Sequence, residues 1–199
     1  MANNESTIPN IEKIGNLIIY LVDEIDKKYK QPLFLTKLLK LLYIIDENAV
    51  KETGVPVTGL SYSAWKMGPV AFEVYKDLKH ENSDKLSCYV EAKKGVGISG
   101  YEWAKINSVN KFDDSEFSDY EIELIDKVID EYGAYDKDKL IELTHEKGGL
   151  WKQVVDENKL EEYFKKENTS SCEIDLSRLL KNDPHRLELF KNAQDSLKL

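Results

Sequence analysis

Three stretches of this 199-residue sequence hold residue types that could bind or catalyse. Residues 63–78 read SAWKMGPVAFEVYKDL, which places an indole, an ammonium group and a thioether beside a Gly-Pro pair. Residues 95–100 read GVGISG and match the G-x-G-x-x-G pattern of dinucleotide-binding loops. Residues 143–151 read LTHEKGGLW, where a histidine and a glutamate precede a tryptophan. These stretches suggest a binding scaffold, a nucleotide site and a hydrolase base, respectively.

The glycine pattern at 95–100 is interpreted as a hairpin loop. A dinucleotide fingerprint works only where its glycines join a strand to a helix whose first amides face the pyrophosphate. Here the residues that follow, YEWAKIN, are aromatic and β-prone, and no βαβ repeat surrounds them. The strand and turn signals therefore predict a small antiparallel insert near residues 86–108.

The three histidines, His80, His145 and His185, stand apart and form no H-E-x-x-H pair. A hydrolase would use His145 as general base with Glu146 or Asp136 orienting it, but no recognisable nucleophile elbow accompanies it. A lone histidine without a base or an orienting group is more often structural or capping. We therefore predict no catalytic residue, no metal site and no cofactor.

The stretch at 63–78 admits several interpretations. Residues 60–66 are expected to be extended, and Gly68-Pro69 then to open a helix, because proline is tolerated in a first helical turn. Free amides at that helix start could bind an anion, although every helix start offers them. Large side chains of this kind serve either a protein interface or the core. The side chains concerned are Tyr62, Trp65, Lys66, Met67, Phe72 and Tyr75.

Apolar periodicity predicts that the rest of the chain is mostly helical. Helices are expected over 10–28 with Asn10 as N-cap, over 36–53 between Thr36 and Gly54, after the capping box Ser118-x-x-Glu121, over 136–146, and after Asp183-Pro184. In the second of these, Asp46 shares the apolar stripe of Leu39 and Leu42 and needs a partner if buried; we predict Lys66.

The fold class is therefore mainly α, with a small antiparallel β hairpin or sheet insert (α+β by strict count). The length suits one self-sufficient domain. We expect a disordered N-terminus at 1–9, a domain over 10–166 with its β insert near 86–108, and a linker with a C-terminal helix over 167–199 that packs on or extends the same domain.

The net charge of −9 and the pI near 5.0 disfavour nucleic acid, because no basic patch is segregated in the sequence. An acidic surface favours either solubility or a basic protein partner. Only two cysteines occur, Cys88 and Cys172, so no disulfide framework is expected. No signal peptide or membrane-spanning run is recognisable, which predicts a cytoplasmic protein without membrane insertion.

Four segments along residues 36–151 resemble those of a known family: TKLLKLLYIID, TGVPV, AWKMGPVAFEVY, and the run from SDYEIELID to THEKGGLW. Together they resemble the Panacea domain, also called the SocA-like antitoxin or phage-associated-protein domain, over roughly Asn10 to Val155. The resemblance implies a mostly helical antitoxin that neutralises a toxin encoded beside it by direct protein contact. A proteolytic adaptor that delivers the toxin to a Clp-type protease is the alternative, and a small hydrolase or nucleotide-binding enzyme is a third possibility.

The resemblance supplies the shared motif positions, and we divide these, together with Met67 from the same stretch, into two sets. Those expected to contact the partner are Trp65, Lys66, Met67, Glu73 and His145. Those expected to hold the fold are Lys40, Leu41, Leu42, Tyr43, Gly54, Pro56, Gly68, Pro69, Val70, Val74, Tyr75, Thr144 and Trp151. Met67 stands where an aromatic residue or histidine is common in the family. No helix-turn-helix precedes the matching segments, which argues against repression of its own operon.

Overall fold

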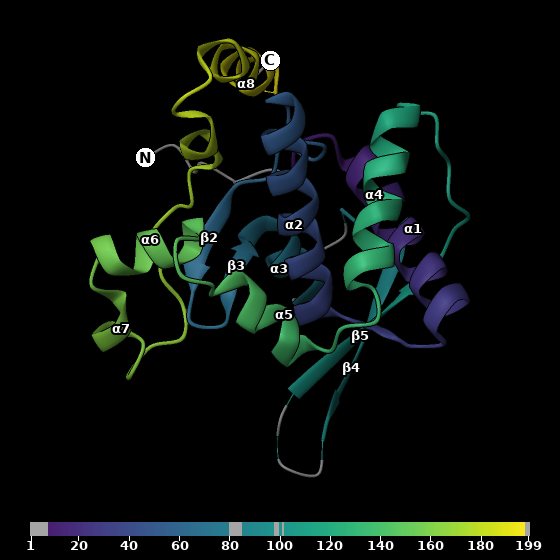
Figure 1. Ribbon diagram of the computed structural model, residues 1–199. Helices are drawn as coiled ribbons and strands as arrows, with labels where there is room; N and C mark the ends of the chain where they lie inside the picture. The colour runs from purple at the N-terminus through teal and green to yellow at the C-terminus, as the bar shows by residue number, and fades with distance from the viewer. Residues whose placement is uncertain (1–7, 80–84, 98–99, 101, 198–199) are drawn as a thin grey trace, which may run out of the picture.

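Helix α2 runs through the middle of the molecule and the other elements pack around it (Figure 1). The computed structural model describes residues 8–79, 85–97, 100 and 102–197. The helices are α1 (Ile11–Tyr29), α2 (Leu35–Thr53), α3 (Phe72–Lys79), α4 (Asp119–Tyr132), α5 (Lys137–Thr144), α6 (Leu150–Glu157), α7 (Leu160–Tyr163), the 3-10 helix η1 (Leu176–Leu180) and α8 (Pro184–Ser196). The strands are β1 (Leu33–Phe34), β2 (Tyr62–Trp65), β3 (Gly68–Ala71), β4 (Val90–Val96) and β5 (Glu102–Ser108). The prediction of a mainly helical fold with a small β insert is confirmed.

Most of the predicted helix boundaries are confirmed. The Asn10 side chain accepts a hydrogen bond from the Lys13 amide at 3.1 Å and caps α1. Both halves of the capping box between Ser118 and Glu121 are formed at α4. Helix α2 differs, because the chain enters it directly from β1. Phe34 is therefore its N-cap and Thr36 lies inside the first turn, so the prediction of a Thr36 cap is wrong.

The insert is an antiparallel hairpin of β4 and β5, and β1 adds to it to give the strand order β1-β5-β4. In Figure 1 this hairpin projects away from the end of the molecule where α8 lies. Gly95 sits in β4 beneath Trp103, where a Cβ would approach the indole to 2.2 Å. The glycine pattern therefore belongs to a hairpin, as predicted, although residues 98 and 99 lie outside the described residues.

The prediction that a helix opens at Pro69 is wrong. Residues Lys66 and Met67 connect β2 to β3, and Pro69 lies in β3 opposite Ala64. Gly68 pairs with Trp65 at φ +101°, a left-handed conformation that glycine adopts readily. Helix α3 begins only at Phe72. Gly-Pro is compatible with a helix start in isolation, but here the glycine closes a β hairpin.

The chain after α7 returns to the outer edge of β2. The Ala64 amide donates to the Cys172 carbonyl at 2.8 Å, and the Ile174 amide donates to the Tyr62 carbonyl at 2.7 Å. The polar segment near 167–171 thus leads into backbone pairing that covers this sheet edge. Helix α8 then lies over the end of α2, with Arg186 packed against Gly54 (Figure 1).

The N-terminal prediction can be examined only in part. Residues 1–7 lie outside the described residues, and Ile8 is buried in the core. No helix in the described part of the chain is both long enough and apolar enough to cross a membrane. Cys88 and Cys172 are free thiols.

Asp46 is fully buried, but its partner is not Lys66, whose side chain is exposed. The carboxylate accepts hydrogen bonds from the Thr58 amide at 2.8 Å and from the Thr58 hydroxyl. The Tyr62 hydroxyl lies 2.8 Å from the second carboxylate oxygen. The predicted Asp46–Lys66 pair is therefore wrong: hydroxyl and amide donors from the chain after α2 satisfy the carboxylate instead. Burial still raises the pKa of Asp46 to about 6.

Replacing Asp46 by asparagine tests this buried acceptor. An amide NH2 cannot accept from these donors, so Asp46→Asn should lower the free energy of unfolding by about 1–3 kcal/mol. Asp114→Asn makes the same chemical change at an exposed site and should stay within about 0.5 kcal/mol of wild type. Urea unfolding measures both. Equal stability of the two variants would contradict the role given to Asp46.

Candidate functional site

The connection between β2 and β3 presents a cluster of large side chains at the surface. We define the turn surface as Trp65, Lys66, Met67, Phe72 and Tyr75. The side chains of Met67 and Phe72 are 43% and 41% exposed. The Trp65 ring lies between its neighbours, 4.8 Å from the Tyr75 ring and 6.3 Å from the Phe72 ring, measured between centroids. Aromatic and methionine side chains grouped in this way suit contact with another protein.

A buried lysine holds the strand beneath this surface. Lys40 projects from α2, is 1% exposed, and donates from Nζ to the Pro69 carbonyl at 2.8 Å. Burial lowers the pKa of the Lys40 ammonium to about 7, because the charged form loses its hydration. Lys40, which precedes Leu41-Leu42-Tyr43 in the sequence, therefore binds the backbone of β3 and does not face solvent.

Gly68 lies against side chains from α2 and α5, which a side chain at this position would displace. A Cβ at Gly68 would lie 2.8 Å from Thr144 Oγ1, 2.9 Å from Lys40 Cε and 3.0 Å from Lys40 Nζ. The Thr144 hydroxyl donates back to the Leu140 carbonyl in α5 at 3.0 Å. The start of β3 is thus fixed between α2 and the end of α5.

The Trp65 backbone is held from a third direction. Trp151 in α6 donates from Nε1 to the Trp65 carbonyl at 2.8 Å. The His145 ring lies flat against the Trp151 indole, with centroids 3.5 Å apart and planes 2° from parallel. The Lys66 amide donates to the Asn168 carbonyl at 3.0 Å. Residues from α2, α5, α6 and the chain after α7 therefore all fix this one turn.

His145 is poorly suited to the base of a hydrolase. Burial lowers its pKa to about 4, and the nearby charges of Lys40 and Lys152 act in the same direction. A group with this pKa is a weak base at neutral pH. Its Nε2 atom is buried without a hydrogen-bond partner in the described residues, and the same is true of Glu73 Oε2.

The structure places the sequence-predicted residues in two layers. Of those expected to contact a partner, Lys66 and Met67 are exposed, whereas Trp65, Glu73 and His145 are half-buried. Those expected to hold the fold are buried, except for half-buried Tyr75: Lys40, Leu41, Leu42, Tyr43, Gly54, Pro56, Gly68, Pro69, Val70, Val74, Thr144 and Trp151. Phe72 was weighed in the sequence but not selected. The sequence could have indicated Phe72 only if β3 had been predicted, because Phe72 is then the first residue of α3 and is exposed next to the turn.

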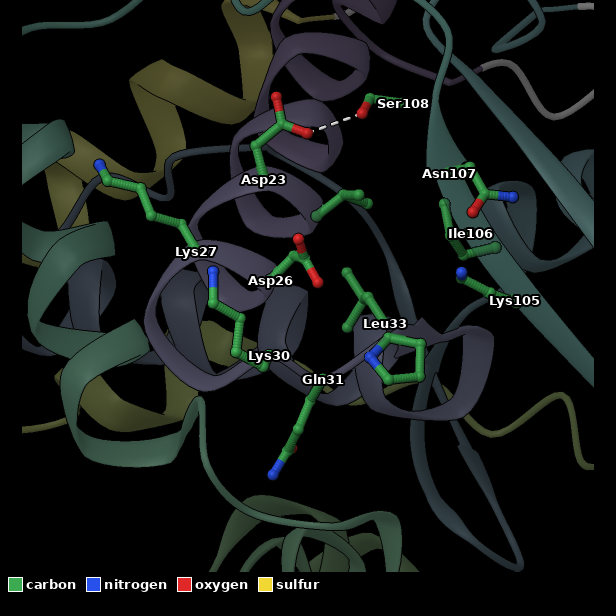
Figure 2. Close-up of a pocket in the computed structure, with 12 residues that line it drawn as sticks. Asp23, Asp26, Lys27, Lys30, Gln31, Leu33, Lys105, Ile106, Asn107 and Ser108 are labelled. Atoms are coloured by element: carbon green, nitrogen blue, oxygen red, sulfur yellow. Dashed lines mark hydrogen bonds between the residues drawn. The ribbon is translucent and has the colours of Figure 1, made fainter.

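A hollow of about 580 Å³ between the end of α1 and β5 has a different character (Figure 2). Polar and charged side chains predominate around it, and the Ser108 hydroxyl donates to the Asp23 carboxylate across it at 2.6 Å. It offers little apolar surface to a protein partner. Within the described residues, no group of three or more His, Cys, Asp or Glu side chains is arranged to hold a metal ion.

Gly68→Ala should be strongly destabilising. The substitution costs about 1 kcal/mol for the left-handed backbone and about 1–3 kcal/mol for the clash with Lys40 and Thr144. Gly148→Ala is the matched control, because its φ is +91° and a Cβ there meets nothing within 4 Å. Urea unfolding should give the Gly68 variant the larger loss by at least about 1 kcal/mol. Equal losses would show that β3 is not confined as described.

The lowered pKa of Lys40 predicts a pH-dependent stability. Between the folded pKa of about 7 and the ordinary lysine value of 10.5, the unfolded chain binds more protons than the folded one. The free energy of unfolding therefore rises with pH in this window. Measured from about pH 6 to about pH 9, wild type should gain about 2–3 kcal/mol relative to Lys40→Met. The exposed-site control Lys66→Met should track wild type, and a constant gap for Lys40→Met would refute the lowered pKa.

Comparison with known families identifies the chain. No curated protein and no solved structure gives a significant match. The model of the family described as antitoxin SocA-like, Panacea domain, matches residues 38–152, more than half of the sequence. The match begins within α2 and ends within α6, so it includes Lys40, the turn surface, Thr144 and Trp151. This chain belongs to the SocA-like antitoxin family and carries its Panacea domain.

Proposed function

We propose that this protein neutralises a toxin encoded beside it by binding that toxin directly, and that the turn surface is part of the contact. The family is described as antitoxin, which supports the general role. The observation that carries the proposal is the exposure of Met67 and Phe72 on a turn held by buried residues from several elements. Exposed apolar side chains on a rigid support are typical of interface anchors, because little conformational entropy is lost on binding.

Occlusion suits this arrangement better than catalysis does. A binding antitoxin needs area and shape complementarity, and buried polar residues serve it by keeping the anchors in one geometry. Lys40, Thr144 and Trp151 supply such support, since each one contacts or confines the backbone of the hairpin formed by β2 and β3. The enzyme alternative depended on His145 and on the glycine pattern at 95–100. The stacking of His145 on Trp151 and its lowered pKa both oppose a role as general base, and Gly95 lies in a strand of an antiparallel hairpin.

Met67→Asp tests the proposed contact. A buried carboxylate without a partner is costly, so the variant should bind the toxin at least about tenfold more weakly, while its stability changes by less than about 0.5 kcal/mol. Tyr163→Asp on α7, where the wild-type side chain is 47% exposed, is the matched control and should bind normally. The readouts are growth of cells that express the neighbouring open reading frame and co-purification of its product.

The same experiment separates the alternatives. Rescue of growth by wild type together with a stable complex supports neutralisation by binding. Rescue with falling toxin levels and no stable complex would replace it with the protease-adaptor role. Full rescue and full binding by Met67→Asp would remove the turn surface from the contact.

A further inference from the structure

Strand β4 forms one edge of the sheet that it shares with β5 and β1. The strand order β1-β5-β4 leaves its outer side without a partner strand in the described residues. The Val109 amide donates to the Tyr89 carbonyl at 2.9 Å, so this pair and every second pair after it carry the hydrogen bonds of the hairpin. The alternate residues Ala92, Lys94 and Val96 therefore point their amides and carbonyls away from β5, and no described residue bonds to these groups. An edge with unpaired amides and carbonyls can accept a further strand.

The free part of this edge is accessible to a second chain. The hairpin projects away from the rest of the molecule (Figure 1), and the Val96 side chain is 67% exposed. At the other end of the strand, Val90 is buried and its amide already donates to the Leu86 carbonyl at 2.9 Å. The Val90 carbonyl belongs to the same alternate set and faces outward. Outward-facing backbone groups thus run from the Val90 carbonyl to Val96.

The charged side chains of β4 determine which strand fits this edge. Lysine on an edge strand opposes pairing unless the incoming strand places a carboxylate opposite it. Glu91 and Lys93 are both exposed, and they lie on the same side of β4 because residues two apart share a face of a strand. A second copy of β4 that runs antiparallel offers the same two charges in reverse order. The edge is therefore complementary to itself.

One register brings the opposite charges together. With Ala92 of both copies on a two-fold axis, Glu91 of each copy lies directly opposite Lys93 of the other. These are non-hydrogen-bonded positions, where the side chains of an antiparallel pair come closest. An axis at Glu91, Lys93 or Lys94 instead places two like charges opposite each other, and an axis at either end of the strand overlaps only a few residues. Charge and overlap thus select Ala92.

The two charges also pair within one chain, and this pairing is compatible with the contact. Lys93 Nζ lies 3.0 Å from Glu91 Oε1, but the side chains are 67% and 50% exposed, and such surface pairs contribute little. In the joined edges, glutamate and lysine alternate on one face, so each charge has an opposite charge along its own strand and another across the axis. The Ala92 amides and carbonyls bond to each other, and each Lys94 amide reaches the Val90 carbonyl of the other copy.

We infer that two copies of this protein associate through β4, antiparallel and with Ala92 on a two-fold axis, so that their sheets join into one continuous sheet. A closed two-fold contact uses the β4 edge of both copies and leaves neither free for further growth. The turn surface belongs to the separate sheet of β2 and β3 and takes no part in the contact. The inference therefore goes beyond the proposed function and does not depend on it.

Exchange of charges tests the register. Glu91→Lys and Lys93→Glu each place like charges opposite each other, so each variant alone should self-associate at least about tenfold more weakly than wild type. A mixture of the two variants should associate, because every lysine then faces a glutamate of the other copy. The variant with both substitutions should self-associate like wild type for the same reason. Lys111→Glu and Glu123→Lys make the same changes in net charge at exposed positions outside β4 and should match wild type. Sedimentation equilibrium of the full chain over about a hundredfold range of concentration measures all of these.

The backbone pairing is tested separately. Ala92→Pro removes an outward-facing amide, which an edge strand tolerates, and should weaken self-association while urea unfolding remains cooperative. In wild type, hydrogen exchange of the Ala92 and Lys94 amides should slow as the protein concentration rises. The Val96 amide lies beyond the overlap of the two strands, so its exchange should not change.

The outcomes decide between the possible occupants of the edge. A monomer at every concentration would overturn the inference, and so would equal association of the charge variants and their controls. Protection at Val96 without protection at Ala92 would refute the register. A monomer whose Ala92 amide becomes protected only when the product of the neighbouring open reading frame is added would assign the edge to that protein and overturn self-association. Failure of the neighbouring product to bind this chain overturns the proposed function and leaves the self-association result as it stands.

Discussion

The structure depends on buried polar side chains of α2 that bind the backbone of other segments. Lys37 donates to the Gly133 carbonyl at 2.6 Å, and Lys40 donates to the Pro69 carbonyl at 2.8 Å. Asp46 accepts from the Thr58 amide. Burying such polar groups is costly unless each one is hydrogen-bonded. The fold must therefore bring the Gly133 carbonyl, the Pro69 carbonyl and the Thr58 amide to α2. The helix therefore specifies where the surrounding loops lie as well as filling the core.

This constraint explains why the family motif contains both buried and exposed positions. Lys40 and Thr144 close around Gly68, and Trp151 holds the Trp65 carbonyl. Few of the motif side chains are free to touch a partner, yet together they determine the shape of the turn that carries Met67. A turn whose backbone is fixed in this way could carry different exposed side chains, so that specificity for a partner would reside in the residues on the turn.

Features that depend on neighbouring residues could be predicted from the sequence, whereas contacts between distant segments could not. The caps at Asn10 and at Ser118 with Glu121, and the hairpin at 86–108, follow from interactions within a few residues. The partner of Asp46 depends on how the chain returns after α2, which no local pattern encodes. Pro69 was placed at a helix start because Gly-Pro fits one, but pairing of β3 with β2 overrode that preference. The exposed anchor Phe72 was missed as a site residue because its position depends on that same strand.

The central claim is that the turn surface is covered when this protein binds its toxin. Oxidative footprinting of the complex tests it most directly, because methionine and aromatic side chains are reactive wherever they are accessible. The account predicts that oxidation of Met67 and Phe72 falls strongly in the complex, while exposed Tyr163 reacts as in the free protein. Unchanged oxidation of those two side chains in a complex that still neutralises the toxin would contradict the account.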